Sequence, residues 1–78
     1  PNPFSAKTII GFKLPVAGSA RVTVFDMAGK LLYHREGYYE AGSHELVIKG
    51  SDLSSSGLLY YQLRTANYAA TKKMILME

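Results

Sequence analysis

Ala-Arg-Val-Thr-Val-Phe-Asp-Met-Ala-Gly-Lys, residues 20–30, is the stretch that decides the fold. Apolar and polar side chains alternate through its first half, and this period of two predicts a strand with one buried and one solvated face. The inward set is Ala20, Val22 and Val24, and the outward set is Arg21 and Thr23. Residues 26–29 predict a tight hairpin turn, because an Asp at its start can accept bonds from turn amides and a Gly at its end tolerates positive φ. The chain therefore returns as a second strand over residues 30–35.

The same alternation recurs on both sides of this hairpin. It predicts further strands over residues 8–14, 43–49, 58–65 and 68–76, separated by turns rich in glycine, proline and asparagine. No window has a convincing 3.6-residue period, so no substantial helix is expected. Six to seven short antiparallel strands predict an all-β fold, an immunoglobulin-like β-sandwich without the Cys–Trp–Cys signature of antibody domains.

Two connections carry apolar residues. Residues 36–42 predict a loop that holds Tyr38 and Tyr39, and residues 50–57 predict a polar loop in which Leu53 is the lone large apolar residue. A single leucine in a serine-rich loop typically covers the edge of a core, so Leu53 is expected to be buried.

Size and composition limit the possible functions. The 78 residues predict one domain, residues 1–78, and the absence of cysteine excludes disulfide frameworks and thiolate metal sites. The net charge of +3 arises from scattered residues without the basic stripe of a nucleic-acid-binding protein, so no nucleic-acid partner is expected. No apolar stretch is long enough to span a bilayer, and no secretory signal opens the sequence. Because the sequence opens at Pro1 without an initiating Met, we interpret the chain as part of a larger protein.

The polar residues do not form a catalytic or metal-binding pattern. Neither His34 nor His44 has a second ligand at metal spacing, and His44 is interpreted as a sheet-end histidine that bonds a turn. The serines at 54–56 do not sit in a strand-to-helix elbow, and the loops of Asp26 and Asp52 lack the alternating ligands of a calcium loop. We expect no catalytic residue, no metal site and no cofactor.

Tyrosines support an alternative function. Exposed rings of Tyr38 and Tyr39, together with Tyr33, Tyr60 and Tyr68, would offer a platform for sugar rings. Aromatic residues also favour strands on propensity alone, so the same tyrosines have a structural explanation. The alternative hypothesis is an immunoglobulin-like accessory module that binds carbohydrate or serves as a structural linker.

The last predicted strand ends in Lys72-Lys73-Met74-Ile75-Leu76. Alternation predicts that Met74 and Leu76 pack inward while Lys73 and Ile75 face outward. Lysines on an edge strand discourage unwanted strand pairing. On the residues alone, the pair therefore indicates either edge protection or recognition by a partner.

Five segments, taken in order, resemble a known family. They are Pro-Asn-Pro-Phe at 1–4, Val-Phe-Asp-Met-Ala-Gly-Lys at 24–30, Tyr-Glu-Ala-Gly-Ser-His at 39–44, Gly-Leu-Leu-Tyr-Tyr-Gln-Leu at 57–63 and the Lys-Lys-hydrophobic strand at 72–76. Together they resemble the C-terminal sorting domain, type A, of the Por-type (type IX) secretion system of Bacteroidetes-like bacteria. Two departures stand out: Leu58-Leu59 replace the usual β-branched residue after glycine, and Met77-Glu78 close the chain in place of a basic residue.

The resemblance implies a signal domain and not an enzyme. Such a domain directs its parent protein through the periplasm and across the outer membrane, after which the parent is found on the cell surface or secreted. The implied partners are the outer-membrane secretion machinery, a sortase-like peptidase that removes the domain and replaces it with a surface anchor, and an upstream cargo domain.

The resemblance also implies residue roles. Recognition of the signal is assigned to Lys72, Lys73, Met74, Ile75 and Leu76. Structural roles in the family motifs are assigned to Pro3, Phe4, Asp26, Gly29, Gly42, Gly57 and Tyr61. We expect a monomer in dilute solution. An edge strand at a chain end can exchange between protomers, so strand-swapped dimers are possible at high concentration.

Overall fold

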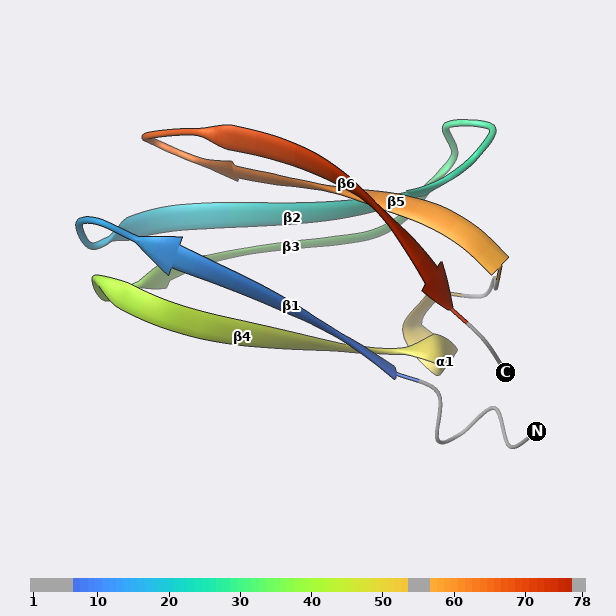
Figure 1. Ribbon diagram of the computed structural model, residues 1–78, viewed down its shortest axis with the longest axis horizontal. Helices are drawn as coiled ribbons and strands as arrows, with labels where there is room; N and C mark the ends of the chain where they lie inside the picture. Colours follow the sequence, from blue (N-terminus) through green and yellow to red (C-terminus); the bar gives the residue numbers. More distant parts are fainter. Residues whose placement is uncertain (1–6, 54–56, 77–78) are drawn as a thin grey trace.

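The computed structural model of the protein describes residues 7–53 and 57–76. In this part, six strands and one helical turn follow one another along the chain (Figure 1). They are β1 (Lys7–Leu14), β2 (Gly18–Asp26), β3 (Leu31–Tyr39), β4 (Gly42–Lys49), α1 (Gly50–Leu53), β5 (Gly57–Thr65) and β6 (Ala69–Leu76). Every strand pairing in the described part is antiparallel, which confirms the predicted all-β class.

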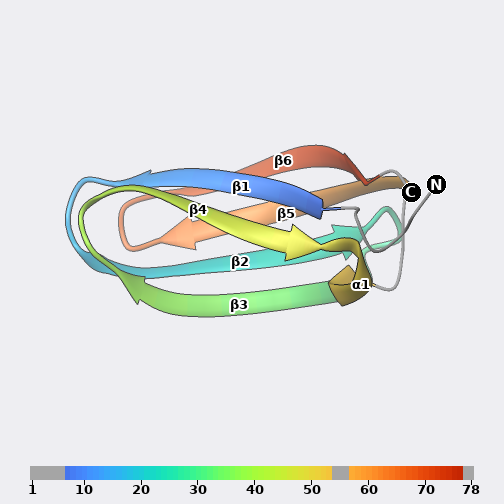
Figure 2. The same ribbon diagram turned by 90° about the horizontal axis from the view of Figure 1, so that it is seen from below.

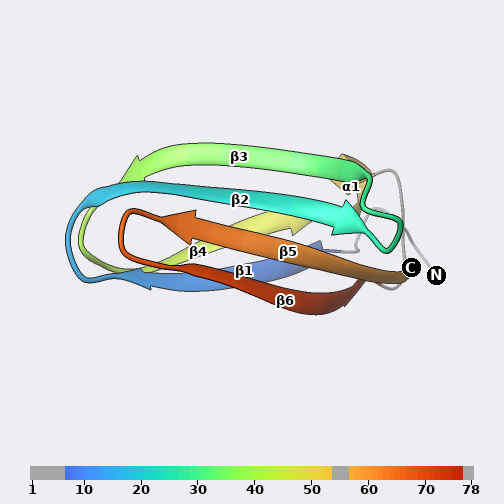
Figure 3. The same cartoon turned by 90° about the horizontal axis from the view of Figure 1, so that it is seen from above.

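The strands form a sandwich of two sheets. One sheet has the order β1-β4, and the other has the order β3-β2-β5-β6. Figures 2 and 3 show the two-stranded sheet lying across one face of the four-stranded sheet. In both views β1 and β6 run along one lateral side of the sandwich, the β1–β6 edge, whereas β3 runs along the opposite side and β4 crosses obliquely between them. We call the side of β3, where α1 contacts both β3 and β4, the β3–β4 edge. This architecture is consistent with the predicted immunoglobulin-like sandwich.

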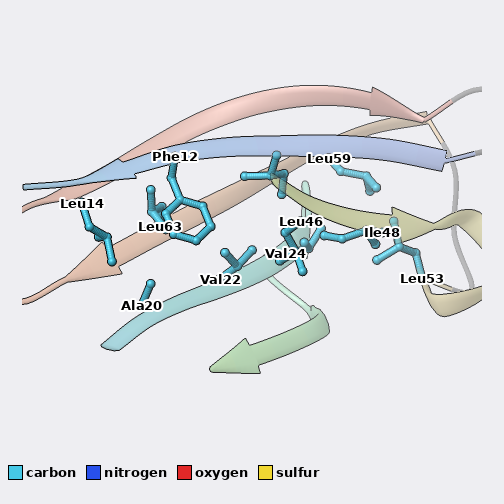
Figure 4. Packing of buried hydrophobic residues seen from close by; sticks show 11 residues of the cluster. Phe12, Leu14, Ala20, Val22, Val24, Leu46, Ile48, Leu53, Leu59 and Leu63 are labelled. Carbon is cyan, nitrogen blue, oxygen red and sulfur yellow. The ribbon is translucent and has the colours of Figure 1, made fainter. Parts of the chain in front are cut away.

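The core between the sheets consists of the alternating apolar residues of the sequence (Figure 4). The buried set is Ile10, Phe12, Leu14, Ala20, Val22, Val24, Leu46, Ile48, Leu53, Leu59 and Leu63. No polar or charged side chain is buried in the described part. Burying each large apolar side chain contributes about 1.5–3 kcal/mol, so the period-two pattern supplies most of the driving force for folding.

The turn between β2 and β3 has the predicted geometry. The Oδ1 atom of Asp26 accepts hydrogen bonds from the amides of Ala28 at 2.9 Å and Lys30 at 2.8 Å. Gly29 has a φ of 88°, a left-handed conformation that glycine adopts without steric cost. The carboxylate and the glycine thus hold the turn from opposite ends.

A β-bulge follows this turn. Phe25 pairs with Leu31 and Val24 pairs with Tyr33, which leaves Leu32 without a partner residue on β2. Such an extra residue lets two neighbouring side chains point to similar sides of a sheet. Leu32 and Tyr33 both pack against the core, while Leu31 is exposed on the outer side. The bulge explains how an uninterrupted apolar run fits a sandwich with one buried face.

Strand β3 is longer than predicted, so the expected loop over residues 36–42 is wrong. The β2–β3 ladder continues until Gly18 pairs with Tyr39. Gly37 interrupts the apolar alternation in the sequence, but the Tyr39 ring lies over it, and a Cβ atom at Gly37 would come within 3.3 Å of that ring. An aromatic ring that packs over a glycine shields the strand backbone as a side chain at that position would, so the strand continues through Gly37. The connection to β4 is only Glu40 and Ala41.

Helical turn α1 closes one end of the β3–β4 edge (Figure 2). The Oδ2 atom of Asp52 accepts a hydrogen bond from the Lys49 amide at 3.0 Å, which ties the turn to the end of β4. Leu53 is fully buried, as the sequence predicts. No helix in the described residues has the length and apolar character needed to cross a bilayer.

Candidate functional site

Strand β6 forms the rim of the four-stranded sheet. In the described part its one pairing partner is β5, with Tyr61 opposite Lys72 and Tyr60 opposite Lys73. The other side of an edge strand presents unpaired N–H and C=O groups to its surroundings. The segment to which the family resemblance assigns recognition, residues 72–76, therefore lies where another strand can be added.

The side chains of β6 alternate between the two faces of this sheet. Met74 is opposite Leu59 and packs against the core, so the inward prediction for Met74 is confirmed. Ile75 is 66% exposed on the outer face, as predicted. For Leu76 the structure describes the backbone, which pairs with Gly57.

The two lysines point to opposite faces of the sheet. Lys72 shares the face of Tyr61, which packs against the core, whereas Lys73 shares the outer face of Tyr60. Both lysines are exposed. The adjacent lysines therefore do not form a single dibasic patch. Instead, each face of the sheet carries one positive charge at the β6 edge.

Part of the outer face beside β6 is apolar. Phe25 and Tyr60 are neighbours on β2 and β5, and their rings stack with centroids 5.2 Å apart at an interplanar angle of 21°. Lys73 is the next residue in this row, and Ile75 lies opposite Leu58, which is 43% exposed. The sequence analysis missed the aromatic pair, since only the strand register shows that these two residues face one another.

One hydrogen bond joins the start of β6 to the other sheet. The Tyr68 hydroxyl donates to the backbone carbonyl of Lys13 on β1 at 2.8 Å. The Thr65 hydroxyl accepts from the amides of Asn67 and Tyr68, each at 3.1 Å, and holds the β5–β6 turn in shape. The turn end of β6 is thus fixed to both sheets. No sequence signal relates Tyr68 to a carbonyl 55 positions away.

The predicted motif residues occupy varied positions. Gly42 and Gly57 have φ angles of 117° and 94°, where a side chain would be strained. Tyr61 is half-buried against the core. Pro3 and Phe4 lie outside the described residues. The structural roles that the resemblance assigns to these residues remain a prediction.

His44 closes the β3–β4 connection. Its Nε2 atom donates to the Glu40 carbonyl at 2.7 Å, and its ring packs near those of Phe12 and Tyr39, with centroid distances of 5.5 and 5.1 Å. The histidine therefore bonds a turn, as predicted. Tyr39 contacts Phe12 edge-on at 5.1 Å, while Tyr38 is 73% exposed on the opposite face. Because Tyr38 and Tyr39 lie on a strand and diverge, the predicted loop placement is wrong and the two rings share no platform.

The described surface contains no group of three or more metal-ligating side chains. An open hollow on the outer side of the β1–β4 sheet is lined by Gly11, Lys13, Ser43 and Glu45, with Phe12 and His44 beneath it. These residues do not present a nucleophile hydrogen-bonded to a base.

These features define a class of protein: a small β-sandwich that offers an edge strand with a lysine on each face. A family model described as the secretion system C-terminal sorting domain matches residues 1–77, and the chain belongs to this family. Comparisons with curated proteins and with solved structures found no match. Family membership implies contact with the type IX secretion machinery and export across the outer membrane to the cell surface or the medium.

Proposed function

We propose that this chain is a non-catalytic C-terminal signal whose β6 edge is read by the outer-membrane machinery. Its parent protein passes through the periplasm and crosses the outer membrane. A sortase-like peptidase then removes the signal and replaces it with a surface anchor. The upstream cargo domain carries the activity of the parent protein.

The observation that carries this proposal is the edge of β6, which pairs with β5 alone among the strands that the structure describes. Main-chain groups on an exposed edge bind an added strand, and the side chains beside them set specificity. Lys72 and Lys73 contribute charge, Ile75 contributes an exposed apolar contact, and Met74 fixes the strand to the core. The family match supports the same reading, because the function of a sorting domain is to be recognised.

An export assay tests the proposal. The chain is fused behind a fluorescent protein in a host with a type IX system, and surface and periplasmic fluorescence are measured. Changing Lys73→Gln together with Ile75→Gln alters only exposed, outward side chains of β6. We expect the fusion to accumulate in the periplasm. Deleting residues 72–78 should have the larger effect of the two.

The chain offers a matched control. Lys7 and Ile9 on β1 repeat the same spacing, are also exposed, and lie on the sheet that does not contain β6. Lys7→Gln with Ile9→Gln should leave export unchanged. Circular dichroism and thermal melting of each purified domain confirm that the folds are equal. Normal export of both the β6 double variant and the truncated fusion would disprove the sorting function of β6.

A further inference from the structure

The net positive charge of the chain is concentrated in its last hairpin. Residues 57–76 contain Arg64, Lys72 and Lys73 and no acidic residue, which gives a formal charge of +3. The other residues contain six of the nine basic side chains and all six acidic ones, so their charges cancel. The one ion pair in the described part joins Arg21 and Glu36, at 4.0 Å, on β2 and β3. This charge distribution makes the electrostatic potential near β6 positive, which favours the approach of an anionic partner.

Strand geometry specifies where the partner's charges must lie. A strand added beside β6 continues the pleat of the sheet, so the side chain next to Lys72 shares its face and the side chain next to Lys73 shares the outer face. Directly opposed residues on neighbouring strands have Cβ atoms about 4.5–5.5 Å apart, close enough for opposite charges to attract. Two carboxylates on consecutive residues would meet one lysine each, whereas carboxylates two residues apart would both lie on one face.

We propose that the β6 edge binds an extended segment of a partner protein that carries two adjacent acidic residues. An apolar residue two positions beyond the acid that meets Lys73 contacts Ile75 on the outer face. Read parallel to β6, the partner motif is acidic, acidic, any residue, apolar. This inference rests on the proposed sorting function and specifies the chemistry of the partner in it.

A second copy of the chain does not match this requirement. Two β6 strands paired antiparallel around Lys72 and Lys73 would oppose lysine with lysine, and like charges in that position destabilise a sheet. The opposite rim of the sheet is β3, where the one acidic residue is Glu36, which pairs with Arg21. No adjacent acidic pair is therefore available on β3. The same lysines that disfavour self-association select a different protein.

The test measures how the 78-residue chain binds four synthetic peptides of about ten residues, the length of a long strand. All four alternate threonine and valine. At their centre they carry two adjacent glutamates, two glutamates separated by one residue, two adjacent glutamines or two adjacent lysines. Amide chemical shifts of the isotopically labelled chain report both the affinity and the strand that is contacted.

We expect the peptide with adjacent glutamates to bind roughly threefold to tenfold more tightly than the peptide with adjacent glutamines, as suits two partly exposed charge pairs. The spaced glutamates should fall between these two, and the lysine peptide should bind least. The shifts should concentrate on amides 69–75, and added salt should reduce the differences. Equal binding of all four peptides, absence of binding, or shifts centred on β3 would overturn the inference.

Charge-reversed variants make the test independent of peptide composition. Lys72→Glu with Lys73→Glu should invert the order, so that the lysine peptide binds best. Lys7→Glu with Lys49→Glu makes the same change in net charge at a lysine pair on the β1–β4 sheet and should leave the order unchanged. An order that responds equally to both double variants would mean that net charge alone attracts the peptides, which contradicts the two-face requirement.

The peptide test and the export assay fail separately. If the peptides do not rank as expected while the β6 variant still blocks export, the acidic partner is refuted and the sorting function stands. If the peptides rank as expected while every β6 variant is exported normally, the chemistry of the edge stands and the sorting function is refuted.

Discussion

The two lateral edges of the sandwich are built differently. At the β3–β4 edge, a two-residue connection joins the sheets, the rings of Phe12, Tyr39 and His44 pack together, and Leu53 fills one end. At the β1–β6 edge, one side-chain hydrogen bond joins the two sheets in the described part of the chain. The Tyr68 hydroxyl donates it to the Lys13 carbonyl. The comparison teaches that both edges are packed against the core, but that side chains and a short connection tie β3 to the other sheet, whereas one hydrogen bond from the β5–β6 turn does so for β6.

The largest expected effect tests the closure of the β3–β4 edge. Leu53→Ala removes a fully buried side chain, and such cavities cost about 2–5 kcal/mol. For a domain of this size we expect the melting temperature to fall by about 10 °C or more. Leu58→Ala is the control, because Leu58 is partly exposed on the outer face and should change stability by about 0.5 kcal/mol or less. An equal loss of stability in both variants would show that Leu53 contributes no more than an exposed surface leucine.

A pair of glycines gives an intermediate effect. Gly42 begins β4 at a φ of 117°, so Gly42→Ala should destabilise the domain by about 1–2 kcal/mol. Gly11 lies within β1, and a Cβ atom there would meet its nearest atom at an ordinary 3.9 Å. Gly11→Ala should therefore be neutral or stabilising by about 0.4–1 kcal/mol. Urea unfolding of both variants measures the difference, and destabilisation by Gly11→Ala as great as that by Gly42→Ala would contradict this account.

The smallest effect sharpens the description of the β1–β6 edge. Tyr68→Phe removes the hydroxyl that donates to the Lys13 carbonyl and should cost about 0.5–1 kcal/mol, the lower range for one hydrogen bond. Hydrogen exchange should accelerate in the amides of β6 while those of β3 and β4 keep their protection. Tyr38→Phe is the control, since that ring is 73% exposed. Uniform acceleration across all strands would show that the bond does not act locally.

The sequence was informative wherever structure follows from local pattern. Alternation predicted the strands and the inward residues, and the Asp26 and Gly29 pair predicted the β2–β3 turn. The burial of Leu53 was predicted because a single large apolar residue in a polar loop typically covers the edge of a core. The inward Met74 and outward Ile75 followed from the same period of two.

The remaining features depend on residues distant in the chain. The strand over residues 36–39 was missed because Gly37 breaks the alternation, and only the packing of Tyr39 over it restores a strand. The Phe25–Tyr60 stack depends on the β2–β5 register, and the Tyr68 hydrogen bond depends on how the sheets lie together. The assignment of β1 and β4 to their own sheet is likewise a property of the whole topology.

That small sheet has a consequence for the time course of assembly. Its pairing extends from Leu14 with Gly42 to Lys7 with Lys49, so its first and last contacts each enclose a long loop. Loop-closure entropy must be lost before such contacts form, and sandwiches of this kind fold in milliseconds to seconds. The hairpins β2–β3 and β5–β6 close over much shorter loops, so we expect the C-terminal β5–β6 hairpin to form before the β1–β4 sheet. A receptor that binds the β5–β6 hairpin at this stage would meet a partly folded domain, whose apolar core is not yet covered by the β1–β4 sheet.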